Sequence, residues 1–285
     1  MADKRAVRVV EVAPRDGLQN EKGQISTESK LRLISLLAGA GFSRIEATAF
    51  VSPRWVPQMA DHDEVMRRAV RRPSLALMAL APNERGAAAA IEAGAQALAV
   101  FASASETFAR KNTNCTIAES IVRFEPAVSL AKRHGLPVRG YVSCAVDCPY
   151  EGPIDPQAVR AVSTRLLEIG CDEIAVADTI GRGTPERVEA MLEETLEAAP
   201  VGLIACHFHD TSGWALANVD VALALGVRTF DSAVAGLGGC PYAPGAAGNL
   251  ATGRLIEHLE ANGYSHGVDK RILSEAELFA RAVRR

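Results

Sequence analysis

The sequence predicts a (β/α)8 barrel. Eight short β-rich runs recur along the 285 residues, and each is followed by a segment of helical composition. This alternation, without a break in composition, is typical of parallel strands joined by crossover helices. Eight such units in about 250 residues match a closed barrel better than an open doubly wound sheet. The dinucleotide-binding pattern G-x-G-x-x-G does not follow the first run, which also disfavours the open sheet.

The strand predictions come from runs rich in apolar and β-branched residues. They cover residues 7–12, 44–49, 75–80, 97–102, 138–143, 173–177, 203–207 and 229–234. Helices are expected between them at 29–40, 63–70, 87–93, 119–133, 156–169, 185–199 and 216–225. Several of these end in an apolar residue followed by glycine, a common helix stop, as in Ala93-Gly94 and Ile169-Gly170.

We expect a single domain over residues 1–285, with the barrel at about 7–260 and a short C-terminal helical extension at about 270–285. The tail at 275–285 has the pattern of a charged amphipathic helix. We expect this helix to be solvated or to face another subunit.

Composition excludes several classes of function. A net charge of −3 offers no electrostatic footprint for nucleic acid or an anionic membrane. No apolar stretch approaches the ~18 residues of a membrane span, and the N-terminus has no room for a signal peptide before the first strand. Six cysteines are too few for a disulfide scaffold in a chain of this length. A cytoplasmic protein is therefore expected.

His207 and His209 form half of a predicted metal site. At spacing i, i+2 on a strand, both imidazoles point to one face, whereas Cys206 points to the other. Asp16 follows strand one and Asn249 follows strand eight, and these strands are neighbours in a closed barrel. The mixed nitrogen and oxygen ligands favour Mg²⁺ or Mn²⁺ with open positions over structural zinc. The alternative is that the two histidines simply hydrogen-bond within the core.

Arg15 and Glu46 are candidates for groups that act beside this metal. A guanidinium at a barrel mouth can stabilise a developing oxyanion, although Arg15-Asp16-Gly17 could also be a solvated turn. Glu46 lies in an apolar run, so a buried carboxylate in need of a partner is expected there. Orienting a metal ligand would satisfy that need.

The stretch 236–249 is rich in glycine and proline and cannot form the interior of a helix or strand. A loop of this length in a compact barrel is typical of an active-site lid. It carries the thiol of Cys240, which can donate a proton. A flexible surface loop with an incidental cysteine is the alternative.

Functional residues of a barrel gather where its strands end. The polar residues expected there are Arg15, Asp16, Glu46, Asn83, Ser103, Cys144, Asp178, Thr179, His207, His209 and Ser232. The Asp178-Thr179 pair is a weak signal by itself, since a helix N-cap explains it equally well.

Six stretches carry a resemblance to a known family. They are PRDGLQNE at 14–21, FVSPRWVPQM at 50–59, RGYVSC at 139–144, CPYEG at 148–152, HFHD at 207–210 and VAGLGGCPY at 234–242. In these residues the sequence resembles the 3-hydroxy-3-methylglutaryl-CoA lyases, metal-dependent barrel lyases related to the isopropylmalate and homocitrate synthases. The wider superfamily shares only the Arg-Asp pair, the buried glutamate and His-x-His, whereas the GLGGCPY loop is specific to the lyases.

The resemblance implies a role for each candidate residue. The metal ligands would be Asp16, His207, His209 and Asn249; Arg15 would stabilise a carbonyl oxygen, Glu46 would be the supporting acid and Cys240 the lid thiol. Asp16 or a histidine would be the base. The substrate would be contacted by Arg15, Gln19, Tyr141, Asp178 and Thr179. The family also implies a homodimer or a higher homo-oligomer.

The implied reaction is a metal-dependent retro-aldol cleavage of 3-hydroxy-3-methylglutaryl-CoA to acetyl-CoA and acetoacetate, as in leucine degradation. Ala177, Trp214 and Gly253 depart from the usual family residues. A lyase for a related acyl-CoA with a longer C3 branch is therefore an alternative. A condensing relative of the synthase type and a non-catalytic metal- or acyl-CoA-binding barrel are two further alternatives.

Overall fold

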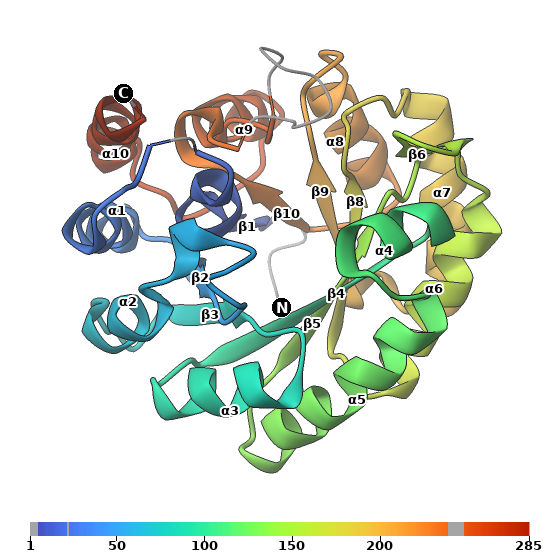
Figure 1. The fold of residues 1–285 in the computed structure, drawn as a ribbon. Coiled ribbons are helices and arrows are strands. Elements are labelled where there is room, and N and C mark those ends of the chain that lie inside the picture. The colour runs from blue at the N-terminus through green and yellow to red at the C-terminus, as the bar shows by residue number, and fades with distance from the viewer. Residues whose placement is uncertain (1–4, 22, 239–247, 285) are drawn as a thin grey trace.

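The structure is a computed structural model that describes residues 5–21, 23–238 and 248–284. Within these residues eight parallel strands close into a barrel in the order β1-β10-β9-β8-β5-β4-β3-β2, with helices around it (Figure 1). The predicted (β/α)8 barrel is confirmed. The register pairs β1 with β10 and β10 with β9, so the strands expected to bring the metal ligands together are neighbours.

Each observed barrel strand lies within two residues of its prediction at both ends. The barrel strands are β1 (Arg8–Glu11), β2 (Arg44–Ala49), β3 (Ala76–Leu80), β4 (Ala97–Ser103), β5 (Val138–Ser143), β8 (Glu173–Asp178), β9 (Ile204–Phe208) and β10 (Thr229–Ser232). A two-stranded hairpin that was not predicted follows β5 and consists of β6 (Asp147–Cys148) and β7 (Gly152–Pro153).

The described helices include all seven predicted between the strands and two that were not predicted, α4 and α9. The helices are α1 (Thr27–Gly39), α2 (His62–Arg68), α3 (Glu84–Glu92), α4 (Glu106–Thr113), α5 (Ile117–Arg133), α6 (Pro156–Glu168), α7 (Pro185–Ala198), α8 (Ala215–Ala224), α9 (Thr252–Ala261) and α10 (Lys270–Val283). Short turns are η1 (Ala13–Gly17), η2 (Pro57–Met59), η3 (Val201–Leu203) and η4 (Val234–Gly236). Among the described helices, none is both long enough and apolar enough to cross a lipid bilayer.

Some helices begin earlier than predicted because polar residues cap them. Ser26 caps α1, and Thr116 with Glu119 forms a capping box on α5. Asn83, which was expected on the functional rim, accepts a hydrogen bond from the Gly86 amide at 2.9 Å and caps α3. Its side chain therefore serves as a helix cap in this structure.

The C-terminal helix α10 packs alongside α1, as Figure 1 shows at the left of the barrel. Leu273, Ala276 and Ala280 are buried on one face, whereas Leu278 is exposed. The expected amphipathic character is present. The buried face covers the helix layer of its own chain, and the expectation of a solvated or subunit-facing surface stays a prediction for the exposed face.

The barrel interior holds charges that the apolar strand pattern did not lead us to expect. Arg139 on β5 is only 2% exposed. Its Nη1 lies 2.7 Å from Asp231 Oδ1 on β10, and its Nε lies 2.9 Å from Glu173 Oε2 on β8. Arg44 on β2 reaches the same glutamate at 2.7 Å. These pairs satisfy charges that would be costly to bury alone.

Candidate active site

The turn that follows β1 presents Arg15 and Asp16 at the end of the barrel. The Asp16 and Gly17 amides both donate to the Val12 carbonyl, at 2.8 and 3.2 Å, which winds η1 into one wide π-type turn. A Cβ on Gly17 would lie 2.8 Å from the Leu237 Cβ, so a glycine is needed for the turn to approach the segment after β10. The two adjacent charges are therefore held by a defined turn.

His207 is held by a carboxylate from the neighbouring strand. Its Nδ1 lies 3.1 Å from Oδ2 of Asp231, which is its register partner on β10. Arg139 binds the other oxygen of this aspartate. The Nε2 atom of His207 lies 4.0 Å from Asp16 Oδ2. A carboxylate on one imidazole nitrogen fixes the ring and frees the other nitrogen for a cation.

His209 and Asn249 complete the group. Ligand atoms of Asp16, His207 and His209 all lie within 4.8 Å of one another, and an isolated β-bridge pairs His209 with Asn249. The Asn249 amide nitrogen donates to Asp16 Oδ2 at 2.7 Å and to the Leu237 carbonyl at 3.0 Å. Its amide oxygen is thus the atom left to bind a cation.

Gly238 makes this placement of Asn249 possible. It has a φ of +92°, and a Cβ there would lie 2.5 Å from Asn249 Nδ2. Any side chain at this position would be strained and would displace the asparagine amide.

The residues present fit a divalent cation. Two imidazoles, a carboxylate and an amide oxygen form the donor set that suits Mg²⁺ or Mn²⁺ with positions left for a substrate. The Nδ1 atom of His209 is buried without a hydrogen-bond partner among the described residues, a cost that a bound ion offsets. Burial, and then the nearby His207, lower the pKa of His209 to about 4, so the ring is neutral as a ligand must be.

Arg15 links the metal cluster to Glu46. Its Nε donates to Glu46 Oε2 at 2.6 Å and its Nη1 donates to Asp16 Oδ1 at 2.7 Å. The sequence placed Glu46 among the residues at strand ends. In the structure it lies inside β2, with the arginine as its partner. Among the described contacts it acts on the metal cluster only through Arg15.

Burial and charge oppose each other in this network. Burial alone would raise the pKa of Asp16, but the Arg15 guanidinium and then the two histidines hold it well below its usual value. Burial raises the pKa of Glu46, and the attraction of Arg15 opposes this. The arginine itself stays charged, since the two carboxylates outweigh its burial and raise its pKa. A fixed cation thus sits beside the cluster.

Tyr141 forms one wall of the same space. Its ring meets His207 edge-on, with centroids 6.2 Å apart, and the Arg15 guanidinium carbon lies 5.7 Å from its centroid. Arg139 donates to the tyrosine hydroxyl at 3.2 Å. Of the residues expected to contact a substrate, Tyr141 and Arg15 are the two that lie at the cluster.

Asp178 and Thr179, two of the other expected substrate residues, accept hydrogen bonds from backbone amides. Asp178 is fully buried, and its carboxylate accepts the Gly183 amide at 2.8 Å and the Arg182 amide at 3.3 Å. Burial raises its pKa to about 6. The Thr179 hydroxyl accepts the Cys144 amide at 2.8 Å, and Gln19 is partly buried just after η1. Contact of these three with a substrate stays a prediction.

The remaining rim residues shape loops. Ser103 accepts the Ser105 amide at 3.0 Å, and Ser232 lies 2.9 Å from the Thr252 hydroxyl. Cys144 has a φ of +54°, which the Thr179 contact helps to hold. All five described cysteines are unbridged and buried. Cys240, together with most of the predicted lid, lies outside the described residues.

Sequence reasoning missed three buried charges, namely Asp231, Arg139 and Glu11. Each is a charged residue inside a predicted strand, and a charge at such a position is the signal that could have found them. Their partners lie on other strands, which a linear pattern does not reveal.

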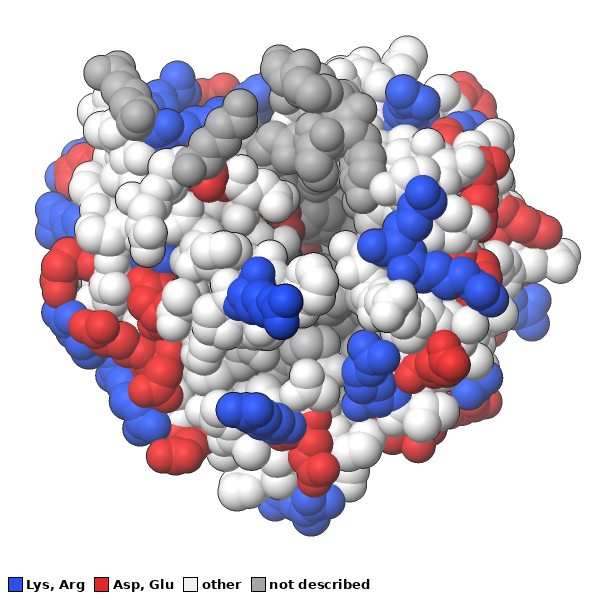
Figure 2. Space-filling model, viewed as in Figure 1, with Lys and Arg blue, Asp and Glu red and all other residues white. Residues whose placement is uncertain are grey.

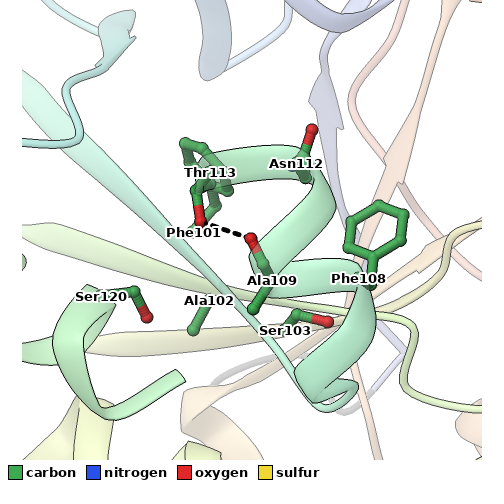
Figure 3. Close-up of a pocket in the computed structure, with 8 residues that line it drawn as sticks. All are labelled: Phe101, Ala102, Ser103, Phe108, Ala109, Asn112, Thr113 and Ser120. Carbon is green, nitrogen blue, oxygen red and sulfur yellow. Dashed lines mark hydrogen bonds between the residues drawn. The ribbon is translucent and has the colours of Figure 1, made fainter. Parts of the chain in front are cut away.

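A separate small cavity lies beside α4 and carries no candidate chemistry (Figure 3). Its volume of about 10 Å³ is room for one water at most. Thr113 donates its hydroxyl to the Ala109 carbonyl at 2.8 Å within the helix. The lining residues are Phe101, Ala102, Ser103, Phe108, Ala109, Asn112, Thr113 and Ser120.

Comparison with known proteins identifies the family to which this chain belongs. The model of the HMGL-like family matches residues 6–279. A hydroxymethylglutaryl-CoA lyase from Pseudomonas mevalonii is 54% identical over 93% of this chain and 88% of its own length. A cytoplasmic 3-hydroxy-3-methylglutaryl-CoA lyase from Mus musculus is 52% identical over 97% of this chain and 81% of its own length.

Solved structures support the same family. The HMG-CoA lyase from Brucella melitensis superposes with a TM-score of 0.97 at 51% identity, covering 98% of this chain and 99% of that one. An HMG-CoA lyase from Acinetobacter baumannii, solved with coenzyme A and 3-methylmalate, has a TM-score of 0.94 at 36% identity, covering 100% of this chain and 93% of that one. Together with the matched barrel and its cluster of metal-binding side chains, these similarities show that the chain belongs to the HMG-CoA lyase family.

Proposed function

We propose that this chain cleaves 3-hydroxy-3-methylglutaryl-CoA to acetyl-CoA and acetoacetate with Mg²⁺ or Mn²⁺ bound. The observation that carries the proposal is the placement of Arg15, paired with Glu46, directly beside the cluster of Asp16, His207 and His209. Relatives that are at least half identical over nearly the whole chain bear the name of this lyase.

The chemistry needs three things from the site. The C3 hydroxyl must lose a proton, the C2–C3 bond must break, and the acetyl-CoA enolate that leaves must be stabilised and then protonated. A divalent cation held by Asp16, His207, His209 and Asn249 would supply a Lewis acid for the hydroxyl and a neighbouring carbonyl. Asp16 or His207 would take the proton, since both point into the same small volume.

Arg15 would stabilise the enolate oxygen. Its charge is permanent, and the bonds to Glu46 and Asp16 fix its direction before a substrate arrives. Tyr141 lies against the same guanidinium and excludes water from one side of it. In the proposed reaction Cys240 returns a proton to the enolate carbon.

The face of the molecule that Figure 2 presents suits a polyanion. Figure 2 shows Lys and Arg side chains spaced over this face around a central hollow. Arg54, in the loop after β2, and Arg110 and Lys111 on α4 are exposed on segments that follow strand ends. Such charges would attract the phosphates of a CoA ester. A homo-oligomeric state and a cytoplasmic location stay predictions.

The test is product release under control of the metal. Protein stripped with a chelator should release neither acetyl-CoA nor acetoacetate from the substrate, and added Mg²⁺ or Mn²⁺ should restore both in equal amounts. Asp16→Asn should stay inactive, whereas Asp220→Asn, an exposed residue of α8, should behave as wild type. Equal turnover with and without metal would overturn the proposal.

Substrate choice is tested in the same assay. Trp214 is 46% exposed where α8 begins, and it departs from the family pattern. Substrates with longer C3 branches should be cleaved more slowly than the methyl compound. A higher kcat/KM for a longer branch would instead assign the chain to a related acyl-CoA.

A further inference from the structure

Glu11 is a fully buried carboxylate at the end of β1 that the proposed chemistry does not use. Its Oε1 accepts the Ala13 and Val234 amides, each at 2.9 Å. Its Oε2 accepts the Thr252 hydroxyl at 2.7 Å. Among the described residues, its hydrogen-bond partners are thus neutral groups.

The three donors belong to the three segments that build the site around β9. Ala13 begins η1, which carries Arg15 and Asp16. Val234 begins η4, which leads to Gly238. Thr252 begins α9, three residues after Asn249. One carboxylate therefore joins the turn of the arginine, the segment that Asn249 packs against and the segment of Asn249 itself.

Other contacts join the start of α9 to the end of β10, and the Asn249–Asp16 bond joins the Asn249 segment to η1. The Thr252 amide donates to the Ala233 carbonyl at 3.1 Å, and the Ala233 amide donates to the Leu250 carbonyl at 3.0 Å. The Thr252 hydroxyl also lies 2.9 Å from the Ser232 hydroxyl. Glu11 adds a second link, to the Ala13 amide at the start of η1, and so fixes the Arg15 turn against the β10 side of the site from both of its ends.

The C-terminal helix closes the same corner. A Cβ at Gly253 would collide with the Glu277 carboxylate of α10, so glycine here lets that side chain lie against the start of α9. Burial raises the pKa of Glu11, and the negative charge of Glu277 adds a smaller rise. These surroundings favour the uncharged form of the Glu11 carboxyl group.

We propose that Glu11 is a positioning residue that aligns η1, η4 and the start of α9, so that Asp16 and Asn249 meet the two histidines. Its role is geometric, because the side chain contacts none of the metal ligands and none of the groups proposed to touch the substrate. The kinetic part of the inference rests on the proposed function, whereas the metal-binding part does not.

The experiment compares Glu11→Ala, Glu11→Gln and Thr252→Val in the full chain. Mn²⁺ affinity is measured by electron paramagnetic resonance without substrate, kcat and KM with substrate, and Tm as a check of folding. Glu11→Ala should weaken Mn²⁺ binding by about 10-fold, the lower end of the effect of losing an outer-shell partner, because Glu11 acts on Asp16 and Asn249 only through their segments, and should lower kcat more than it raises KM. Thr252→Val, which removes one of three bonds, should show a smaller loss of Mn²⁺ affinity in the same direction.

Glu11→Gln is the rescue variant. Its amide oxygen can accept both backbone amides and its nitrogen can donate to Thr252, so Mn²⁺ affinity and kcat should stay within about threefold of wild type. Thr195→Val, a buried hydroxyl on α7 away from the site, controls for generic loss of a buried bond and should leave both unchanged.

Two results would overturn the inference. One is a folded Glu11→Ala variant with wild-type Mn²⁺ affinity. The other is a Glu11→Gln variant as impaired as the alanine, since hydrogen bonding would then not be the property that matters. Should the alanine variant fail to fold, the Thr252→Val and Glu11→Gln pair still decides. Loss of lyase activity in the wild type with metal binding intact would count against the proposed function alone.

Discussion

Two buried carboxylates on adjacent strands, Glu11 of β1 and Glu46 of β2, are stabilised in opposite ways. Both are fully buried, and burial raises the pKa of both. Glu46 binds the Arg15 guanidinium, whereas Glu11 binds two backbone amides and a hydroxyl. A buried acid with a cation carries charge into the site, and a buried acid with neutral donors holds segments together.

The difference assigns different consequences to loss of each side chain. Removing Glu46 leaves Arg15 with Asp16 as its remaining anionic partner and changes the electrostatics of the cluster. Removing Glu11 leaves the charges of the metal cluster in place but removes three of the hydrogen bonds that hold η1, η4 and the start of α9 together. The three predictions that follow sharpen this contrast.

The largest effect is expected for Arg15→Gln. Loss of the enolate-stabilising charge should lower kcat by about 10²- to 10³-fold. Because Glu46 is left buried without its cation, the free energy of unfolding should also fall by about 3–5 kcal/mol. Adding Glu46→Gln should recover stability but not kcat. Steady-state kinetics and thermal unfolding measure the two; turnover within a few-fold of wild type would remove Arg15 from its role.

A smaller effect concerns the pH dependence of stability at Glu11. Burial raises the pKa of this carboxyl from 4.5 to about 7, so the folded state favours its neutral form. The contribution of Glu11 to the free energy of unfolding is fully present below pH 4.5 and is lost as the pH rises through 7. Relative to Glu11→Gln, the wild type should therefore lose up to about 3 kcal/mol between these pH values. Denaturant unfolding of both proteins at pH 5, 6, 7 and 8 measures this; parallel pH profiles would contradict it.

The smallest effect is expected for Glu46→Gln. Arg15 keeps its bond to Asp16 and loses part of its orientation, so kcat should fall about tenfold, in line with one charged hydrogen bond. Stability should change little, since the variant also removes a buried charge. Kinetics in parallel with thermal unfolding checks this. An unchanged kcat would place Glu46 in the same class as Glu11.

The contrast also separates what the sequence could reveal from what it could not. Strand period and the closure of the barrel were enough to predict that Asp16, His207, His209 and Asn249 gather at one end. They were not enough to predict which side chains pair between neighbouring elements. The partner of Glu46 is Arg15 rather than a metal ligand, because the pairing depends on the three-dimensional path of η1.

Local hydrogen bonding explains the positions of two of the predicted rim residues. Asn83 and Asp178 have side chains that bind backbone amides a few residues ahead, and this competes with any role in a site. Glu11 and Asp231 were missed for the opposite reason. Each is a buried charge within a strand, and only the neighbouring segments show what it binds.

The most direct test of the metal site is a Mn²⁺ titration followed by electron paramagnetic resonance in wild type and His209→Ala. We expect one tight site per chain in the wild type and a loss of affinity of at least about 100-fold in the variant, because a buried ligand is removed. His258→Ala, whose histidine lies on α9 away from the cluster, should bind as wild type. Wild-type Mn²⁺ affinity in His209→Ala would contradict the assignment of this cluster as the metal site.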